Sequence, residues 1–173
     1  LGAIKDVGSR KSPSVEDIGN LSPDLILVNQ AGKDDIDTLY KSLSEVAPTV
    51  VTQGKSEAWK QDFLLIAAAL GTTEKAEKLM EEYTTKAKSV GQKAGTEKTF
   101  SFLYASADRT RIFAKSSFVG SICQDASLAR PAAAQVEKTS IDLSSEQLDQ
   151  ADGDYLFYGV QGGDESKLTG EAL

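Results

Sequence analysis

The chain has 173 residues, 40% of them hydrophobic, with 19 Lys and Arg against 26 Asp and Glu, one Cys and no His. The length suits one ordinary domain or two small lobes. Without histidine, the chain cannot itself supply a Ser-His-Asp or Cys-His nucleophile system or a His-ligated zinc site. The lone Cys123 permits neither an intrachain disulfide nor a thiolate zinc site. The charge of −7 argues against a nucleic-acid partner, because binding to phosphates depends on Lys and Arg.

The first third of the chain predicts a β-α-β unit. Residues 14–21 form a short helix candidate after Pro13, and a continuous apolar run at 25–28 indicates a strand buried on both faces of a parallel sheet. Apolar residues at helical spacing predict a helix over 35–46, and a second short strand follows Pro48 at 49–52. Loop residues after the first strand, beginning with Asn29, would lie at the carboxyl edge of the sheet.

The middle of the chain is predicted to be helical. An apolar stripe over residues 58–70 ends at Gly71, and a new helix begins near Thr72 and runs over about 74–92. At 1.5 Å per residue the second helix would be roughly 28 Å long. We expect a helix of this length to bridge two lobes.

The last third predicts a second α/β lobe. Strands are expected at 99–104 and 111–114 and a helix at 118–126, while 91–98 is predicted to be a loop and 131–139 a connection. The chain then repeats its opening pattern, a short helix followed by a strand.

That repeat carries identical Ser, Glu and Asp residues 130 positions apart. Ser14, Glu16 and Asp24 in the first copy match Ser144, Glu146 and Asp154 in the second. One interpretation is local, since Glu favours helix starts and Asp favours turns. The other interpretation is a pair of equivalent lobes, each presenting a carboxylate.

At these residues the sequence resembles the class III solute-binding proteins of ABC importers, the group that binds ferric siderophores and cobalamin. The resemblance rests on six segments in the family's order: VGSRKSPSVE at 7–16, LSPDLI at 21–26, VAPTVV at 46–51, AAALG at 67–71 leading into KAEKL at 75–79, SSFVG at 116–120 and LSSEQL at 143–148. It implies an α/β fold of two Rossmann-like lobes with parallel sheets, joined by a long helical spine.

The resemblance also implies a domain organisation. Residues 1–54 would be part of the N-terminal α/β lobe, 55–94 the helical region with the interlobe helix, and 95–173 part of the C-terminal lobe. Relative to the family, elements are missing at both ends, so the chain is expected to be truncated. Cys123 does not lie in a lipobox and is predicted to be a buried small hydrophobe.

Ferric siderophores are compact and partly apolar, and they present iron-bound oxygens that suit Arg donors and aromatic walls. Open α/β sheets bind ligands beyond the carboxyl ends of their strands. These arguments, with the ligand-contacting arginine that the resemblance implies at Arg10, give the predicted ligand-binding residues: Arg10, Asn29, Gln30, Tyr104, Arg109, Arg111, Phe118 and Tyr158. A solvated loop Arg10, a solvated turn at Arg109 and Arg111, and a core Phe118 are the structural alternatives.

The resemblance gives Glu16 and Glu146 another role, since in the family one glutamate at each lobe's tip meets arginines of the permease. It implies a monomeric, extracytoplasmic binding protein without catalytic activity. In a Gram-positive organism this protein would be lipid-anchored. Neither a cofactor nor a metal site is expected, because ferric iron arrives inside the siderophore as cargo.

Several alternatives stay open. The cargo could be cobalamin, haem or a metal ion, although receptors for free metal ions commonly use His as a ligand. A carboxylate-based hydrolase using Asp108, Asp125 or Asp154 is the enzymatic alternative, because glycosidases need only two carboxyl groups. The segment Gly54-Lys55-Ser56 mimics the end of a phosphate-binding loop but has Thr49 where that motif needs Gly.

Overall fold

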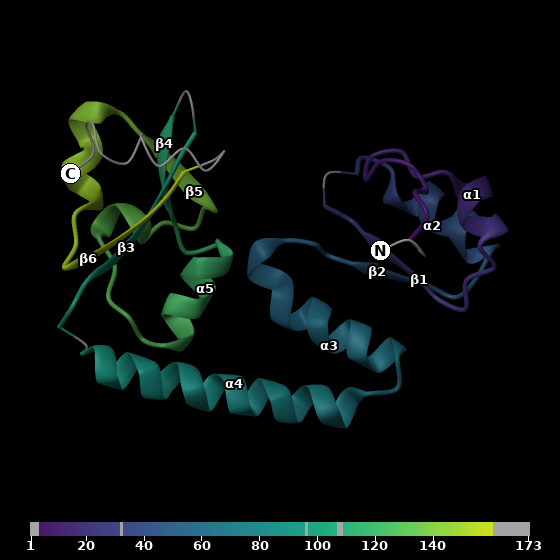
Figure 1. Ribbon diagram of the computed structural model, residues 1–173, viewed down its shortest axis with the longest axis horizontal. Coiled ribbons are helices and arrows are strands. Elements are labelled where there is room, and N and C mark those ends of the chain that lie inside the picture. The colour runs from purple at the N-terminus through teal and green to yellow at the C-terminus, as the bar shows by residue number, and fades with distance from the viewer. Residues whose placement is uncertain (1–3, 32, 96, 107–108, 161–173) are drawn as a thin grey trace. The chain divides into compact units, whose positions relative to one another are not determined.

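The computed structural model describes residues 4–31, 33–95, 97–106 and 109–160 (Figure 1). The chain divides into two compact units, Leu1–Glu77 and Lys78–Leu173, each with its own sheet. Helix α4 (Thr73–Ala94) runs through the boundary between them. The α/β class is therefore confirmed, whereas the three-part division at residues 54/55 and 94/95 stays a prediction.

The first unit contains the predicted β-α-β arrangement. Strands β1 (Ile26–Asn29) and β2 (Thr49–Thr52) pair in parallel, with Ile26 opposite Thr49 and Asn29 opposite Thr52. Helix α1 (Val15–Asn20) precedes β1, and α2 (Ile36–Ser44) connects the two strands. Because β1 and β2 are parallel, their carboxyl ends lie at the same edge of the sheet.

The core of the first unit lies on one side of β1. Ile26 and Val28 are buried with Leu43 of α2 and Ala47, and apolar side chains of α1 pack against them. Leu27, which points to the other face, is 46% exposed. The predicted burial of β1 on both faces is thus wrong for the described residues, because both α1 and α2 place their apolar side chains on the Ile26 side.

The helical region follows the predicted boundaries closely. A 3₁₀ turn, η1 (Ser56–Ala58), leads into α3 (Trp59–Ala69), and Gly71 stands beyond its end with a φ of 67°. A positive φ of this kind favours glycine, which has no Cβ to clash with the following carbonyl. Helix α4 then extends over 22 residues, slightly longer than expected at its carboxyl end.

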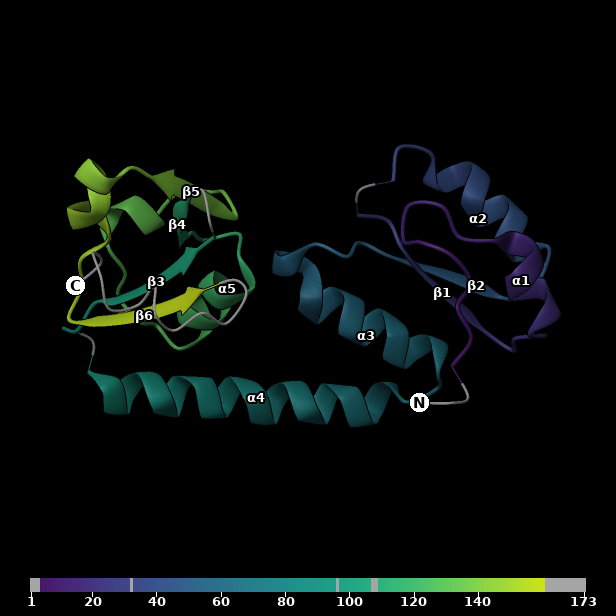
Figure 2. The same ribbon diagram turned by 45° about the horizontal axis from the view of Figure 1, so that its top comes forward.

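The second unit has a four-stranded mixed sheet in the order β5-β4-β3-β6 (Figure 2). Its strands are β3 (Phe100–Ala105), β4 (Thr110–Phe113), β5 (Ser140–Leu143) and β6 (Tyr155–Val160). Strands β3 and β6 pair in parallel as predicted, whereas β4 runs antiparallel to both β3 and β5. The parallel prediction therefore holds for only part of this sheet.

The two faces of this sheet differ in composition. One face carries Leu103, Ile112 and Leu143, which are buried with Ala134 of η2 (Ala132–Ala134) and Ala151 of η3 (Ser145–Ala151). The other face carries the neighbours of these residues along each strand, since side chains alternate along a strand. Helix α5 (Phe118–Asp125) lies below β4 and β5 in the view of Figure 1.

Helices α4 and α5 approach closely at Gly91. The sequence predicts Gly91 to begin a loop, but it lies inside α4 and is buried. A Cβ at this position would overlap the carbonyl oxygen of Ala126, the residue that caps α5. Nearby, the Tyr83 hydroxyl donates a 2.7 Å hydrogen bond to Asp125, and burial together with this bond raises the pKa of Tyr83. Gly91 is thus required by packing, not by its backbone conformation.

We expect Gly91→Ala to lower the free energy of unfolding by about 2–3 kcal/mol, because the added methyl group forces α4 away from α5. The exposed Thr85 in the same helix provides the control. Thr85→Ala should be neutral or stabilising by about 0.5 kcal/mol, since alanine is the better helix former. Urea unfolding followed by circular dichroism measures both effects. A stabilising Gly91→Ala would show that helix propensity outweighs the contact.

Candidate functional site

One group of predicted site residues lies in the first unit, where a hollow of about 290 Å³ opens beside β1. Its polar members include the predicted ligand residues Arg10 and Asn29. The full lining is Val7, Gly8, Ser9, Arg10, Pro13, Ile18, Ile26, Leu27, Val28, Asn29, Lys33 and Leu43. A largely apolar wall with a few polar groups is typical of small-molecule sites, although the volume is at the lower end of their usual range of about 300–1,000 Å³.

Arg10 and Asn29 are held by the same short segment. The Arg10 Nη1 atom donates to the carbonyl of Ala31 at 3.2 Å, and the Ala31 backbone N–H donates to the Asn29 side chain at 2.7 Å. Gln30 is exposed, and its backbone N–H donates to the carbonyl of Thr52, the last residue of β2. The structure therefore brings all three predicted residues of this unit to the carboxyl edge of the β1–β2 sheet.

Two residues that shape this edge were missed by the sequence analysis. Gly54, with a φ of 65°, lies so close to Asn29 that a Cβ would overlap the Asn29 side-chain amide. The Asp62 carboxylate accepts hydrogen bonds from the backbone N–H groups of Gln53 and Gly54, both at 2.8 Å. Gly54, which mimicked part of a phosphate-binding loop in the sequence, thus allows the backbone after β2 to pack closely against Asn29.

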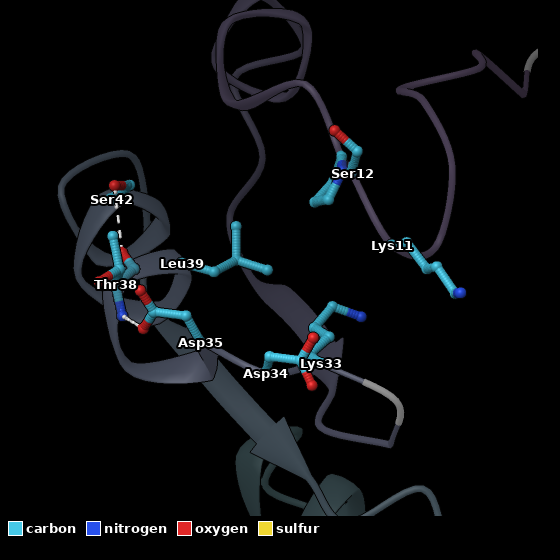
Figure 3. A pocket seen from close by; sticks show the side chains of 9 residues that line it. Lys11, Ser12, Lys33, Asp34, Asp35, Thr38, Leu39 and Ser42 are labelled. Atoms are coloured by element: carbon cyan, nitrogen blue, oxygen red, sulfur yellow. Dashed lines mark hydrogen bonds between the residues drawn. The ribbon is translucent and has the colours of Figure 1, made fainter.

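A neighbouring hollow of about 470 Å³ lies between the loop of Lys11 and Ser12 and the start of α2 (Figure 3). Lys11 and Lys33 are balanced there by Asp34 and Asp35. The Asp35 carboxylate caps α2 by accepting from the Thr38 backbone N–H at 3.0 Å, and hydrogen bonding to Thr38 lowers the pKa of Asp35. This hollow therefore carries no excess charge from its lysines and aspartates.

A separate group of predicted site residues lies on the sheet of the second unit. Tyr104 of β3 is opposite Arg111 of β4, and Arg111 is opposite Asp142 of β5. Directly opposite residues share a face, so these side chains form one row on the face away from the core. Arg109, which precedes β4, reaches the same Asp142 carboxylate at 3.9 Å. Three predicted residues therefore meet here, around a carboxylate that the sequence analysis missed.

The other two predicted residues of this unit lie apart from that row. Tyr158 is opposite Leu103 and packs against the buried core on the far face of the sheet. Phe118 is the first residue of α5 and is 52% exposed, so its ring is not the core residue of the structural alternative. A ligand role for Tyr158 has no support from its position.

The two repeated glutamates occupy equivalent places in their units. Glu16 lies in the first turn of α1, whose N-cap Ser14 accepts from the Asp17 backbone N–H at 3.1 Å. Glu146 lies in the first turn of η3, where the Ser144 backbone N–H donates to the Gln147 side chain at 3.2 Å. Both glutamates are exposed. The repeat is thus structural, and it leaves each carboxylate facing solvent at the start of a short helix.

The two described carboxylates of the hydrolase alternative, Asp125 and Asp154, have structural partners. Asp154 accepts from Lys98 at 2.7 Å and from the Thr99 backbone, and these bonds, the Lys98 bond first, hold the pKa of Asp154 well below its usual range. Asp125 accepts from Tyr83, and Asp108 lies outside the described residues. Asp154 therefore links the residue before β6 to the residues before β3, which explains why an Asp precedes β6.

Cys123 is buried at 2% exposure, and burial raises the pKa of its thiol, so the prediction of a small buried hydrophobe is confirmed. Among the residues that the structure describes, no group of three or more His, Cys, Asp or Glu side chains could hold a metal ion. Within the same ranges, none of the helices combines the length and apolar character needed to cross a bilayer.

Comparison with curated proteins finds three Bacillus subtilis relatives with binding functions in their names. The chain is 31% identical to the probable siderophore-binding lipoprotein YfiY, over 96% of this chain and 53% of that protein. It is 30% identical to the iron(3+)-hydroxamate-binding protein FhuD, over 94% of this chain and 53% of that protein. The third, the Fe(3+)-citrate-binding protein YfmC, is 26% identical over 91% of this chain and 50% of that protein. The chain thus spans about half the length of the curated relatives it matches.

Solved structures show the same fold. Staphylococcus aureus SirA matches with a TM-score of 0.78 and 28% identity, over 95% of this chain and 62% of SirA. SirA complexed with staphyloferrin B matches with a TM-score of 0.75 over 92% of this chain and 57% of SirA. A family model described as periplasmic binding protein matches residues 1–171. Consistent with its two α/β units and its repeated helix-strand motif, the chain belongs to the periplasmic binding protein family.

Proposed function

We propose that the protein captures a ferric siderophore outside the cytoplasmic membrane and delivers it to an ABC transporter permease for iron uptake. The observation that carries the proposal is an arginine in each unit beside the carboxyl edge of a sheet: Arg10 near β1, and Arg111 opposite Tyr104 near the end of β3. Relatives named for siderophore and ferric hydroxamate binding support this cargo.

The proposed ligand residues follow from these positions. Arg10 and Asn29 supply the first unit's polar groups, and Gln30 stands exposed beside them. Tyr104, Arg109 and Arg111 form the second unit's contribution, with the exposed Phe118 as a candidate apolar contact. Guanidinium forks suit the oxygens around ferric iron because they donate several hydrogen bonds in one plane.

The remaining parts of the proposal concern the whole protein. The protein would act as a monomer, by binding alone and without a resident cofactor, since the ferric iron is cargo. Its place would be the periplasm or the outer face of the cytoplasmic membrane, where a lipid anchor would hold it. Glu16 and Glu146 would dock on the permease, because they are exposed and lie in the equivalent turns of the two units.

The single tryptophan, Trp59 at the start of α3, gives a direct test of the cargo. Titration of the full-length protein with ferric hydroxamate, ferric catecholate and ferric citrate should quench its fluorescence saturably with at least one of them. The iron-free siderophores serve as the control for non-specific quenching. Binding of cobalamin or haem with no response to any ferric complex would contradict the proposed function.

A further inference from the structure

The candidate arginines of the second unit share one counter-ion, Asp142. The Arg111 Nε atom lies 3.2 Å from one oxygen of this carboxylate, and the Arg109 Nη1 atom lies 3.9 Å from the other. Asp142 comes from β5, so a different strand supplies the carboxylate directly opposite Arg111. The three side chains together carry a charge of +1, whereas the two arginines alone would carry +2.

The carboxylate is also the most solvent-accessible member of this group. The side chain of Asp142 is 61% exposed, compared with 25% for Arg111 and 51% for Arg109. An anion that approaches Arg111 from solvent therefore meets the negative charge of Asp142 as well as the positive charges. The hydrogen bond from Arg111 to Asp142 is donated by Nε, the guanidinium nitrogen nearest the main chain.

We propose that Asp142 is a specificity-determining residue that lowers the affinity of the site for highly charged anionic ferric complexes relative to neutral ones. This inference rests on the proposed function, and it adds the charge class of the cargo. A neutral ferric trihydroxamate gains hydrogen bonds from the arginines without repulsion from Asp142. A ferric tris-catecholate, with a charge of about −3, gains the same bonds but is repelled by the carboxylate.

Simple electrostatics gives the size of the effect. Repulsion between one carboxylate and a trivalent anion about 8 Å away weakens binding about tenfold in bulk water, and screening at low salt leaves about fivefold. At roughly 0.5 M salt, where the screening length is only a few ångströms, the effect should fall below about twofold. The selectivity should therefore depend on ionic strength.

The test compares Asp142→Asn with wild type in the full-length protein, by equilibrium dialysis against a ferric trihydroxamate and a ferric tris-catecholate. We expect Asp142→Asn to bind the tris-catecholate about fivefold more tightly at low salt, with little change for the trihydroxamate. Asp142→Glu keeps the charge and should retain the wild-type preference. Dialysis follows the visible absorbance of the ferric complex, so the result does not depend on Trp59.

Glu137 provides a matched control for net charge. Its carboxylate pairs with Lys115 at 3.2 Å, and its side chain is 76% exposed. Lys115 follows the carboxyl end of β4, whereas Arg109 precedes the amino end of this strand. Glu137→Gln removes the same charge from the same unit and should leave the preference unchanged. An equal gain in Glu137→Gln would overturn the inference, because it would show an effect of net charge alone.

Three further outcomes distinguish a failure of this inference from a failure of the proposed function. If wild type binds ferric complexes but Asp142→Asn weakens both equally, Asp142 merely orients Arg111 and the specificity role is wrong. Equal affinities of Asp142→Asn and wild type for both complexes would also overturn it, while the proposed function would stand. If wild type binds no ferric complex of any charge, the proposed function itself fails and the inference fails with it.

Discussion

Replacing Arg10 or Arg111 with Gln is expected to weaken ferric siderophore binding by about 10- to 100-fold for each variant. Hydrogen bonds to charged groups contribute about 1.5–3 kcal/mol, and Gln can replace neither the charge nor the planar fork of donors. Each arginine lies at the carboxyl edge of a sheet in its own unit, so we expect both losses to be large. Fluorescence titration at fixed salt measures both dissociation constants.

Two kinds of control sharpen this prediction. Arg10→Lys and Arg111→Lys keep the charge but lose the fork, so partial rescue would measure the purely electrostatic share. Lys75→Gln in the first unit and Lys88→Gln in the second remove a charge from exposed positions of α4 and should leave the affinity unchanged. Wild-type affinity in both Arg→Gln variants would contradict the placement of the ligand site.

Much of the first unit could be predicted from local sequence signals. The apolar run behind Ser22-Pro23-Asp24 and the helical spacing before Pro48 gave β1, α2 and β2 to within two residues. Because the sequence predicts that β1 and β2 are parallel, it also predicts that Asn29 lies at the carboxyl edge of their sheet, without any tertiary information. The face of β1 that stays exposed could not be predicted in this way, since it depends on where α1 and α2 pack.

The parts that could not be predicted depend on contacts between distant residues. Strand β5 (Ser140–Leu143) alternates polar and apolar residues over only four positions. It has neither the apolar run of β1 nor a nearby preceding proline such as Pro23 or Pro48, so it does not stand out from the connection before it. Its pairing with β4 is what places Asp142 opposite Arg111. Likewise, Gly91 carries no sequence signal of helix-helix contact, because an isolated glycine near a helix end also indicates a stop.

The repeat is the feature in which sequence and structure together go beyond either alone. Identical residues 130 positions apart indicated equivalent motifs, but identity at Ser and Glu is also what helix capping would select. The structure shows that Ser14 and Ser144 both begin short helices while Glu16 and Glu146 are exposed and make none of the capping contacts. Capping hydrogen bonds thus account for the serines, whereas the local role of the glutamates is limited to the favourable position of an acidic side chain in the first turn of a helix.

If the glutamates dock on the permease, the Glu16→Gln and Glu146→Gln double variant of the full-length protein should bind its ferric siderophore normally but support no uptake. Each single variant should reduce the initial uptake rate in part, because opposite charges at an interface set the orientation and rate of docking more than its affinity. The measurement is transport of radioactive iron, as the ferric siderophore, into cells that lack the chromosomal copy of the binding protein.

The matched control is Asp17→Asn with Asp149→Asn, which removes one exposed carboxylate from each of the same short helices. Uptake by this control should stay near wild type, because docking depends on the position of the charge and not on the net charge of each helix. Loss of siderophore binding in the Glu16 and Glu146 variant would contradict a docking role, since these glutamates would then serve the ligand site. Equal loss of uptake in both double variants would instead point to a diffuse negative surface, in which the repeated glutamates have no special place.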